Sequence, residues 1–164
     1  MDSEEFAEQL EVLMTEAVEL RSSVAMPKVT DQADEILDRL YKVRQQLDRL
    51  EEIMRQVNRM KFLAERQKAA SQAAADDDWA TALSKLRSLP TFRNESMIGP
   101  REKYAEADLS TMKQKRALRK AEDLLNKVTE ANEFIRTCYF GLNGVREDIK
   151  YLMRTLTTEA RIER

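Results

Sequence analysis

Histidine is absent from the 164-residue sequence, and cysteine occurs once, as Cys138. The missing histidine removes the commonest general base and the commonest metal ligand. A single cysteine cannot form an internal disulfide or a thiolate zinc cluster. We therefore predict a protein that is not an enzyme, binds no metal and uses no cofactor.

Glycine and proline are also scarce, with 3 residues of each, and aromatic residues make up 6% of the chain. A sandwich or barrel of many strands needs more turn residues than this. About half of the sequence is Ala, Glu, Lys, Leu or Arg, a composition typical of long helices and coiled coils. The predicted fold class is all-α.

Long apolar runs are missing as well, since none approaches the roughly 20 residues that a helix needs to span a bilayer. The run Met1-Asp2-Ser3-Glu4-Glu5 is acidic, unlike the start of a signal peptide. We expect a cytoplasmic protein that makes no contact with a membrane.

Charge is plentiful and unevenly distributed along the chain. Residues 1–58 carry 7 Lys or Arg and 14 Asp or Glu, a net charge of −7. Residues 79–120 carry 10 Lys or Arg and 4 Asp or Glu, a net charge of +6. Such separation indicates either a contact with a polyanion or an orientation of like subunits, acidic part to basic part.

The apolar pattern predicts a single helical domain over residues 1–164. A first helix is expected over residues 3–25, because an apolar residue recurs every three or four positions from Phe6 to Val24. A second is expected over residues 31–75. Its apolar residues follow the alternating spacing of a coiled-coil seam, namely Ile36, Leu40, Val43, Leu47, Leu50, Met54 and Val57. Near residue 60 the seam is predicted either to become polar or to shift onto Met60 and Leu63.

Residues 76–100 are predicted to form a connector that contains a short helix. Asp77 or Asp78 would cap this helix, which would run from Trp79 to Leu89 and end before Pro90. Clustered carboxylates such as Asp76-Asp77-Asp78 can also hold Mg²⁺, but capping is the favoured interpretation because no second carboxylate motif accompanies them.

A long helix is predicted over residues 101–160. Its stripe is about 60 Å long and comprises Ala117, Ala121, Leu124, Val128, Ala131, Ile135, Cys138, Leu142, Val145, Ile149, Leu152 and Leu156. Gly141 and Gly144 lie inside it and are interpreted as tolerated glycines, the alternative being a hinge or the close approach of another backbone.

These elements predict a long antiparallel helical hairpin, a coiled coil, with an additional N-terminal helix. The last helix is longer than its partner, so part of its stripe would need the first helix or another subunit, and we expect a homo-oligomer. The predicted oligomer seam is Leu124, Val128, Ile135, Cys138, Leu142, Val145, Ile149, Leu152 and Leu156. Cys138 is expected to be a buried, small apolar residue within it.

Basic residues gather where the hairpin would turn, and they are the candidate nucleic-acid-binding site. Helical spacing places Lys113, Arg116 and Lys120 on one stripe, with Lys115 and Arg119 on the opposite face. Clustered cations bind phosphate backbones, whereas the alternative is a solvated face or a protein contact. The candidates are Arg59, Lys61, Arg66, Lys68, Arg101, Lys103, Lys113, Lys115, Arg116, Arg119 and Lys120.

Trp79 and Phe92 are predicted beside these cations. Bases could stack on the two rings. The favoured interpretation is that Trp79 packs the short helix onto the hairpin.

Two motifs carry a family resemblance, mainly over residues 101–160. They are Lys113-x-Lys115-Arg116-x-x-Arg119-Lys120, followed by the long seam, and Val145-Arg146-x-Asp148-Ile149-x-x-Leu152-Met153-Arg154. In this pattern the chain resembles the small phage-encoded recombination mediator proteins of the UvsY type.

The resemblance implies an oligomer that binds single-stranded DNA inside a bacterial host cell. Such a mediator helps to load a RecA-like recombinase onto strands covered by single-strand-binding protein, and it performs no catalysis. The phosphate contacts would be Lys113, Lys115, Arg116, Arg119 and Lys120. The alternative function is a structural or adaptor coiled coil, such as a virion scaffold or an assembly chaperone, whose basic hairpin tip meets an acidic protein.

Overall fold

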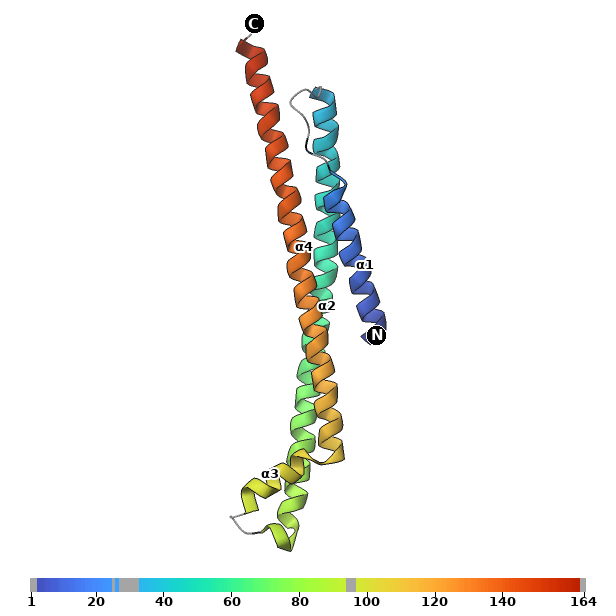
Figure 1. The fold of residues 1–164 in the computed structure, drawn as a ribbon, viewed down its shortest axis with the longest axis vertical. Coiled ribbons are helices and arrows are strands. Elements are labelled where there is room, and N and C mark those ends of the chain that lie inside the picture. Colours follow the sequence, from blue (N-terminus) through green and yellow to red (C-terminus); the bar gives the residue numbers. More distant parts are fainter. Residues whose placement is uncertain (1–2, 25, 27–32, 94–96, 163–164) are drawn as a thin grey trace. The chain divides into compact units, whose positions relative to one another are not determined.

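The protein was analysed as a computed structural model, which describes residues 3–24, 26, 33–93 and 97–162. Four α-helices and one short 3-10 helix follow one another along the chain, and these residues contain no strand (Figure 1). The helices are α1 (Ser3–Ser22), α2 (Ala33–Ser88), α3 (Ile98–Glu106) and α4 (Leu109–Ile162), with η1 (Pro90–Phe92) between α2 and α3. The all-α prediction is confirmed.

The chain divides into two compact units. Unit 1 comprises Met1–Arg59 and Thr129–Arg164, and unit 2 comprises Met60–Val128. Helices α2 and α4 each contribute residues to both units, whereas α1 belongs to unit 1 and α3 to unit 2.

Helix α1 begins where the sequence predicts and ends three residues earlier, at Ser22. The hydroxyl of Ser22 donates to the carbonyl of Glu19 over 3.1 Å, and that of Ser23 donates to the carbonyl of Leu20 over 3.1 Å. Serine hydroxyls that donate to nearby carbonyls compete with the backbone hydrogen bonds that would continue the helix. Residue 25, the last of the predicted helix, lies outside the described residues.

Helix α2 does not end near residue 75, so the predicted connector over residues 76–100 is wrong at its start. The Asp76-Asp77-Asp78 run lies inside the helix instead of capping a new one. Asp76 accepts a hydrogen bond from Gln72 one turn earlier, over 2.9 Å, and Asp78 accepts one from Ser110 over 2.6 Å. These side-chain partners hold the carboxylates on the surface of a continuous helix.

The predicted helix over residues 101–160 is also interrupted near its start. Helix α3 ends at Glu106, and Asp108 caps α4 because its carboxylate accepts the backbone N–H of Ser110 over 2.9 Å. From Leu109 to Ile162 the helix is continuous, and it passes through Gly141 and Gly144 without a positive φ.

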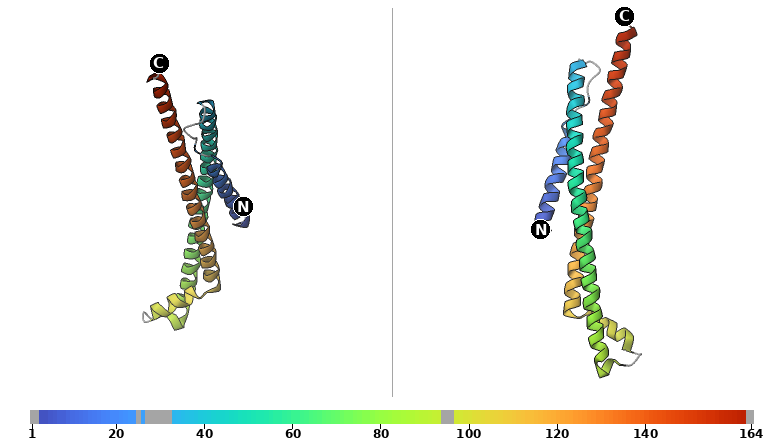
Figure 2. Two further views of the ribbon diagram at one scale, coloured as in Figure 1. Left: turned by 45° about the horizontal axis from the view of Figure 1, so that its top comes forward. Right: turned by 180° about the vertical axis from the view of Figure 1, so that it is seen from behind.

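Unit 1 consists of α1 and the parts of α2 and α4 that belong to it (Figures 1 and 2). Glu51 of α2 accepts a hydrogen bond from Tyr139 of α4, and Asn58 of α2 accepts one from Asn132 of α4, both over 3.0 Å. Because the residue numbers rise on α2 while they fall on α4, the two segments run antiparallel. Helix α1 lies beside α2.

The core of unit 1 follows the predicted pattern with one shift. Ile53 is fully buried where the spacing predicts Met54, which is half-buried. Helix α1 buries four of its predicted apolar residues. The buried apolar residues are Phe6, Leu10, Leu13, Ala17, Ile36, Val43, Leu47, Leu50, Ile53, Val57, Ala131, Ile135, Cys138, Leu142 and Ile149.

Unit 2 pairs the second part of α2 with the first part of α4 through smaller side chains. The Nζ atom of Lys68 lies 3.3 Å from the carboxylate of Glu122, and the Ser110–Asp78 hydrogen bond lies further along α2. These segments therefore also run antiparallel. The buried apolar residues are Met60, Ala64, Ala75, Ala82, Ala105, Ala121, Leu124 and Val128. Of the two predicted replacements in the seam, Met60 is buried and Leu63 is exposed.

The predicted oligomer seam is largely buried within the single chain. Six of its nine residues are buried there, namely Leu124, Val128, Ile135, Cys138, Leu142 and Ile149. The other three, Val145, Leu152 and Leu156, are half-buried. The sequence predicts that only the part of the stripe beyond its partner helix needs the first helix or another subunit, and over residues 124–142 the seam residues are buried within their own chain.

A basic groove on helix α4

One face of α4 in unit 2 forms a shallow groove of about 360 Å³. Six residues line it, namely Leu109, Met112, Lys113, Arg116, Ala117 and Lys120. Helical spacing predicts a shared stripe for Lys113, Arg116 and Lys120, and the structure places all three in this groove. Ala117, predicted at the start of the buried stripe, is exposed in it.

The position of the groove follows from how α4 begins. The Asp108 cap makes Leu109 the first residue of the helix, so the groove starts in its first turn. Thr111 is fully buried on the opposite side of this segment. Since Thr111 faces the core, residues about half a helical turn away from it point outward. This phase moves Ala117 out of the core.

The three groove cations are not neutralised by neighbouring carboxylates. Lys113, Arg116 and Lys120 are exposed, and the residues that line the groove include no acid. Within the described part of the chain, no ion pair engages these three side chains. Positive charge of this kind attracts an anionic ligand, and added salt weakens the binding of that ligand because it screens the charges.

The floor of the groove is apolar, which sequence reasoning missed. Leu109 is 85% exposed and Met112 is 40% exposed. Both follow the Asp108 cap, and the Asp-x-Ser sequence at that point is the signal that could have located the helix start. The groove therefore offers an apolar surface next to a row of cations.

Other predicted phosphate contacts already have partners inside unit 2. Lys68 pairs with Glu122, and the Nζ atom of Lys115 lies 3.6 Å from the carboxylate of Glu106. The guanidinium of Arg66 lies 5.9 Å from the centre of the Phe62 ring. The Nε atom of Arg101 donates to the carbonyl of Met97 over 3.2 Å. These four cations therefore have contacts of their own and do not belong to the residues that line the groove.

The remaining candidates do not line the groove either. Lys103 and Arg119 are exposed elsewhere in unit 2, and Lys61 is half-buried. Arg59 is exposed and belongs to unit 1. Of the eleven predicted residues, the structure brings three together in one groove.

The predicted stacking rings also lie outside the groove. Trp79 is half-buried within α2, which is one continuous helix where the sequence predicts two. The Phe92 ring packs edge to face on Tyr104, with 5.4 Å between ring centres and 68° between ring planes. Phe92 therefore serves packing between η1 and α3.

A second groove, in unit 1, differs in its charge. It has a volume of about 580 Å³ and is lined by Leu37, Leu40, Tyr41, Arg44, Leu47, Asp48, Glu51, Tyr139, Arg146 and Lys150. Its lining includes two carboxylates, Asp48 and Glu51, as well as three cations. Tyr139 donates to Glu51, and this hydrogen bond, followed by burial, raises the pKa of Tyr139 above its ordinary value of 10.0. A mixed lining suits a polyanion less well than the basic groove of α4.

In the described ranges, no group of three or more Cys, Asp or Glu side chains is arranged to hold a metal ion. None of the helices, over those same ranges, is both long and apolar enough to cross a membrane.

Comparisons of the chain with protein-family models, with curated proteins and with solved structures found no match. The resemblance to recombination mediators therefore stays a prediction based on the motifs in residues 101–160.

Proposed function

We propose that the protein binds single-stranded DNA through the basic groove of α4 and acts without catalysis. In this proposal α2 and α4 form an antiparallel coiled-coil hairpin, and several copies assemble. The protein is phage-encoded and works in the cytoplasm of the bacterial host. It helps to load a RecA-like recombinase onto strands that single-strand-binding protein covers.

The observation that carries this proposal is the set of three cations without ion pairs in the groove. Lys113, Arg116 and Lys120 lie on successive turns, separated by about 5 Å along the helix axis. A flexible chain of phosphates can adjust to such a row, and binding then releases counterions. No base-specific geometry is needed for this contact.

The apolar floor favours a single strand over a duplex. Leu109 and Met112 are exposed in the groove, just before the first of the three cations along α4. In a single strand the flat faces of the bases are free to contact apolar side chains, whereas in a duplex they are stacked on one another. The combination of phosphate charge and exposed bases matches the two kinds of surface in the groove.

An acidic protein partner is the second candidate ligand. An amphipathic segment with apolar and acidic residues would also match Leu109, Met112 and the groove cations. This ligand corresponds to the adaptor or scaffold function. The two candidates differ in their response to oligonucleotides, so one binding experiment separates them.

The test is a fluorescence anisotropy titration of labelled oligo-dT at several salt concentrations. We expect binding at low salt and a slope of log K against log salt that includes about −2 from three phosphate contacts. The triple variant Lys113→Gln, Arg116→Gln, Lys120→Gln should lose most of the affinity.

The matched control is Lys42→Gln, Arg136→Gln, Arg154→Gln, which removes the same charge from exposed positions in unit 1. It should bind nearly as well as the unmodified protein. Absence of binding at about 50 mM salt, or an equal loss in both triple variants, would reject the DNA proposal and favour the adaptor function.

A further inference from the structure

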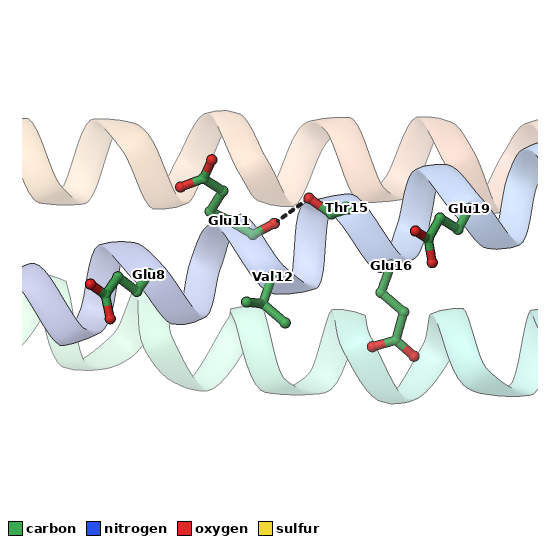
Figure 3. Close-up of a pocket in the computed structure, with 6 residues that line it drawn as sticks. All are labelled: Glu8, Glu11, Val12, Thr15, Glu16 and Glu19. Carbon is green, nitrogen blue, oxygen red and sulfur yellow. Dashed lines mark hydrogen bonds between the residues drawn. The ribbon is translucent and has the colours of Figure 1, made fainter.

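The outer face of α1 is an acidic counterpart to the basic groove. Six residues line a shallow groove of about 520 Å³ on this helix, namely Glu8, Glu11, Val12, Thr15, Glu16 and Glu19. Figure 3 shows the four glutamates distributed around Val12, which is 65% exposed. The face therefore has an apolar centre bordered by charges of one sign.

Three of these four glutamates have no ion-pair partner among the residues that the structure describes. Glu16 binds Arg49 over 2.5 and 2.9 Å, and this hydrogen-bonded pair raises the pKa of Arg49 above its ordinary value. Glu8, Glu11 and Glu19 enter no ion pair with any other described residue. The carboxylates of these three glutamates are therefore available to a cationic partner outside unit 1.

The two faces match in length and in pattern. The acidic face extends from Glu8 to Glu19 and the basic groove from Leu109 to Lys120, so each covers about 16 Å of helix axis. Three glutamates and three cations, all without an ion pair to another described residue, correspond to one another. Exposed Val12 corresponds to exposed Leu109 and Met112.

We propose that the acidic face of α1 in one copy docks in the basic groove of α4 in a second copy. A second copy is the occupant that charge complementarity favours, because every chain carries one face of each kind. The contact is heterologous, since different surfaces meet, so after pairing the first copy keeps its basic groove free and the second keeps its acidic face free. Copies can therefore add in a head-to-tail manner.

This contact has two measurable properties. It involves about three helical turns on each side, which is small for a protein interface. The contact is therefore weak, and the fraction of associated protein rises with protein concentration. It depends on exposed charges, so added salt dissociates it. Any polyanion that enters the groove competes with it.

The inference uses the basic groove but does not depend on the proposed DNA ligand. Self-association without oligonucleotide binding would reject the proposed function alone. Oligonucleotide binding without self-association would reject the present inference alone.

The test uses two charge-reversed full-length proteins. The first carries Glu8→Lys, Glu11→Lys and Glu19→Lys, and the second carries Lys113→Glu, Arg116→Glu and Lys120→Glu. All six side chains are exposed, so the helices should form in both, which circular dichroism verifies. Sedimentation velocity at low salt then measures the average mass over a concentration series.

We expect the mass of the unmodified protein to rise with concentration and to fall as salt is added. Each reversed protein alone should stay monomeric, whereas an equimolar mixture should associate, because each acidic face then meets a basic one. The control Lys42→Glu, Arg136→Glu, Arg154→Glu should associate like the unmodified protein. A mixture that stays monomeric, or an unmodified protein whose mass does not change over the series, would overturn the inference.

Discussion

Unit 1 and unit 2 both contain parts of α2 and α4, but the side chains buried in their cores differ in size. In unit 1 the fully buried residues include Ile36, Leu50, Ile53 and Ile135. In unit 2 alanines supply most of the buried positions. Larger side chains remove more apolar area from water, so burial stabilises unit 1 more.

The same contrast extends to the surface. Unit 1 is the part with a third helix, and its α2–α4 groove has carboxylates beside its cations. Unit 2 leaves Leu109, Met112 and the three groove cations exposed on one face. The comparison indicates that unit 1 supplies more of the stability, whereas unit 2 presents the proposed binding surface.

The largest expected effect comes from truncating a fully buried residue of α4 in each unit. Ile135→Ala in unit 1 should lower the free energy of unfolding by about 2–5 kcal/mol. Thr111→Ala in unit 2 should cost less than about 1 kcal/mol, because it removes one methyl group and a buried hydroxyl without a partner. Urea unfolding followed by circular dichroism measures both. Equal costs would contradict the contrast between the two cores.

A smaller effect is expected at the hydrogen bond between α2 and α4 in unit 1. Tyr139→Phe removes the bond to Glu51 and should cost about 1.5 kcal/mol near neutral pH. Because folding raises the pKa of Tyr139, this contribution is complete below the unfolded pKa near 10 and is lost as pH rises through the folded pKa.

Stability measured at several pH values tests this assignment. The unmodified protein and the Phe variant should converge at high pH. If the difference in free energy of unfolding between the two proteins stays constant across the alkaline range, ionisation of Tyr139 does not remove its contribution to stability, and the assignment is wrong.

The smallest expected effect is at Gly144, and its sign is the informative part. A methyl group there would have no heavy atom within 4 Å, so Gly144→Ala should stabilise the helix by about 1 kcal/mol. Thermal unfolding at low and high protein concentration measures it. Destabilisation that grows with concentration would indicate that another backbone approaches this glycine in an assembly.

Much of the fold could be predicted because helix patterns are local. Most of the seam from Ile36 to Val57 and the burial of Cys138 follow from apolar spacing, which a single helix determines, whereas Ile53 is buried in place of Met54. The grouping of Lys113, Arg116 and Lys120 was predictable for the same reason, since residues three and four apart share a face.

The failures concern features that distant residues decide. Asp78 resembles a helix cap in the sequence, but Ser110, 32 residues away, binds it inside a continuous helix. Asp108 caps α4 amid residues that favour helix, so the break after Glu106 was missed. Glu122 neutralises Lys68 only because the two segments of unit 2 pair in a register that spacing within one helix does not give.

The exposed apolar floor of the groove was missed for a related reason. Leu109 lies in the first turn of α4, and its exposure depends on where that helix begins. Ala117 is exposed because the helix phase that buries Thr111 turns position 117 outward. Sequence spacing alone could not set the phase of this segment.

The most direct measurement is to map where a photoreactive single-stranded oligonucleotide crosslinks to the protein. If the basic groove is the binding surface, crosslinks should concentrate between Leu109 and Lys120, with Met112 among the labelled residues, and should disappear in the Lys113→Gln, Arg116→Gln, Lys120→Gln variant. Crosslinks that concentrate in unit 1, or that survive in this variant, would contradict the assignment of binding to unit 2.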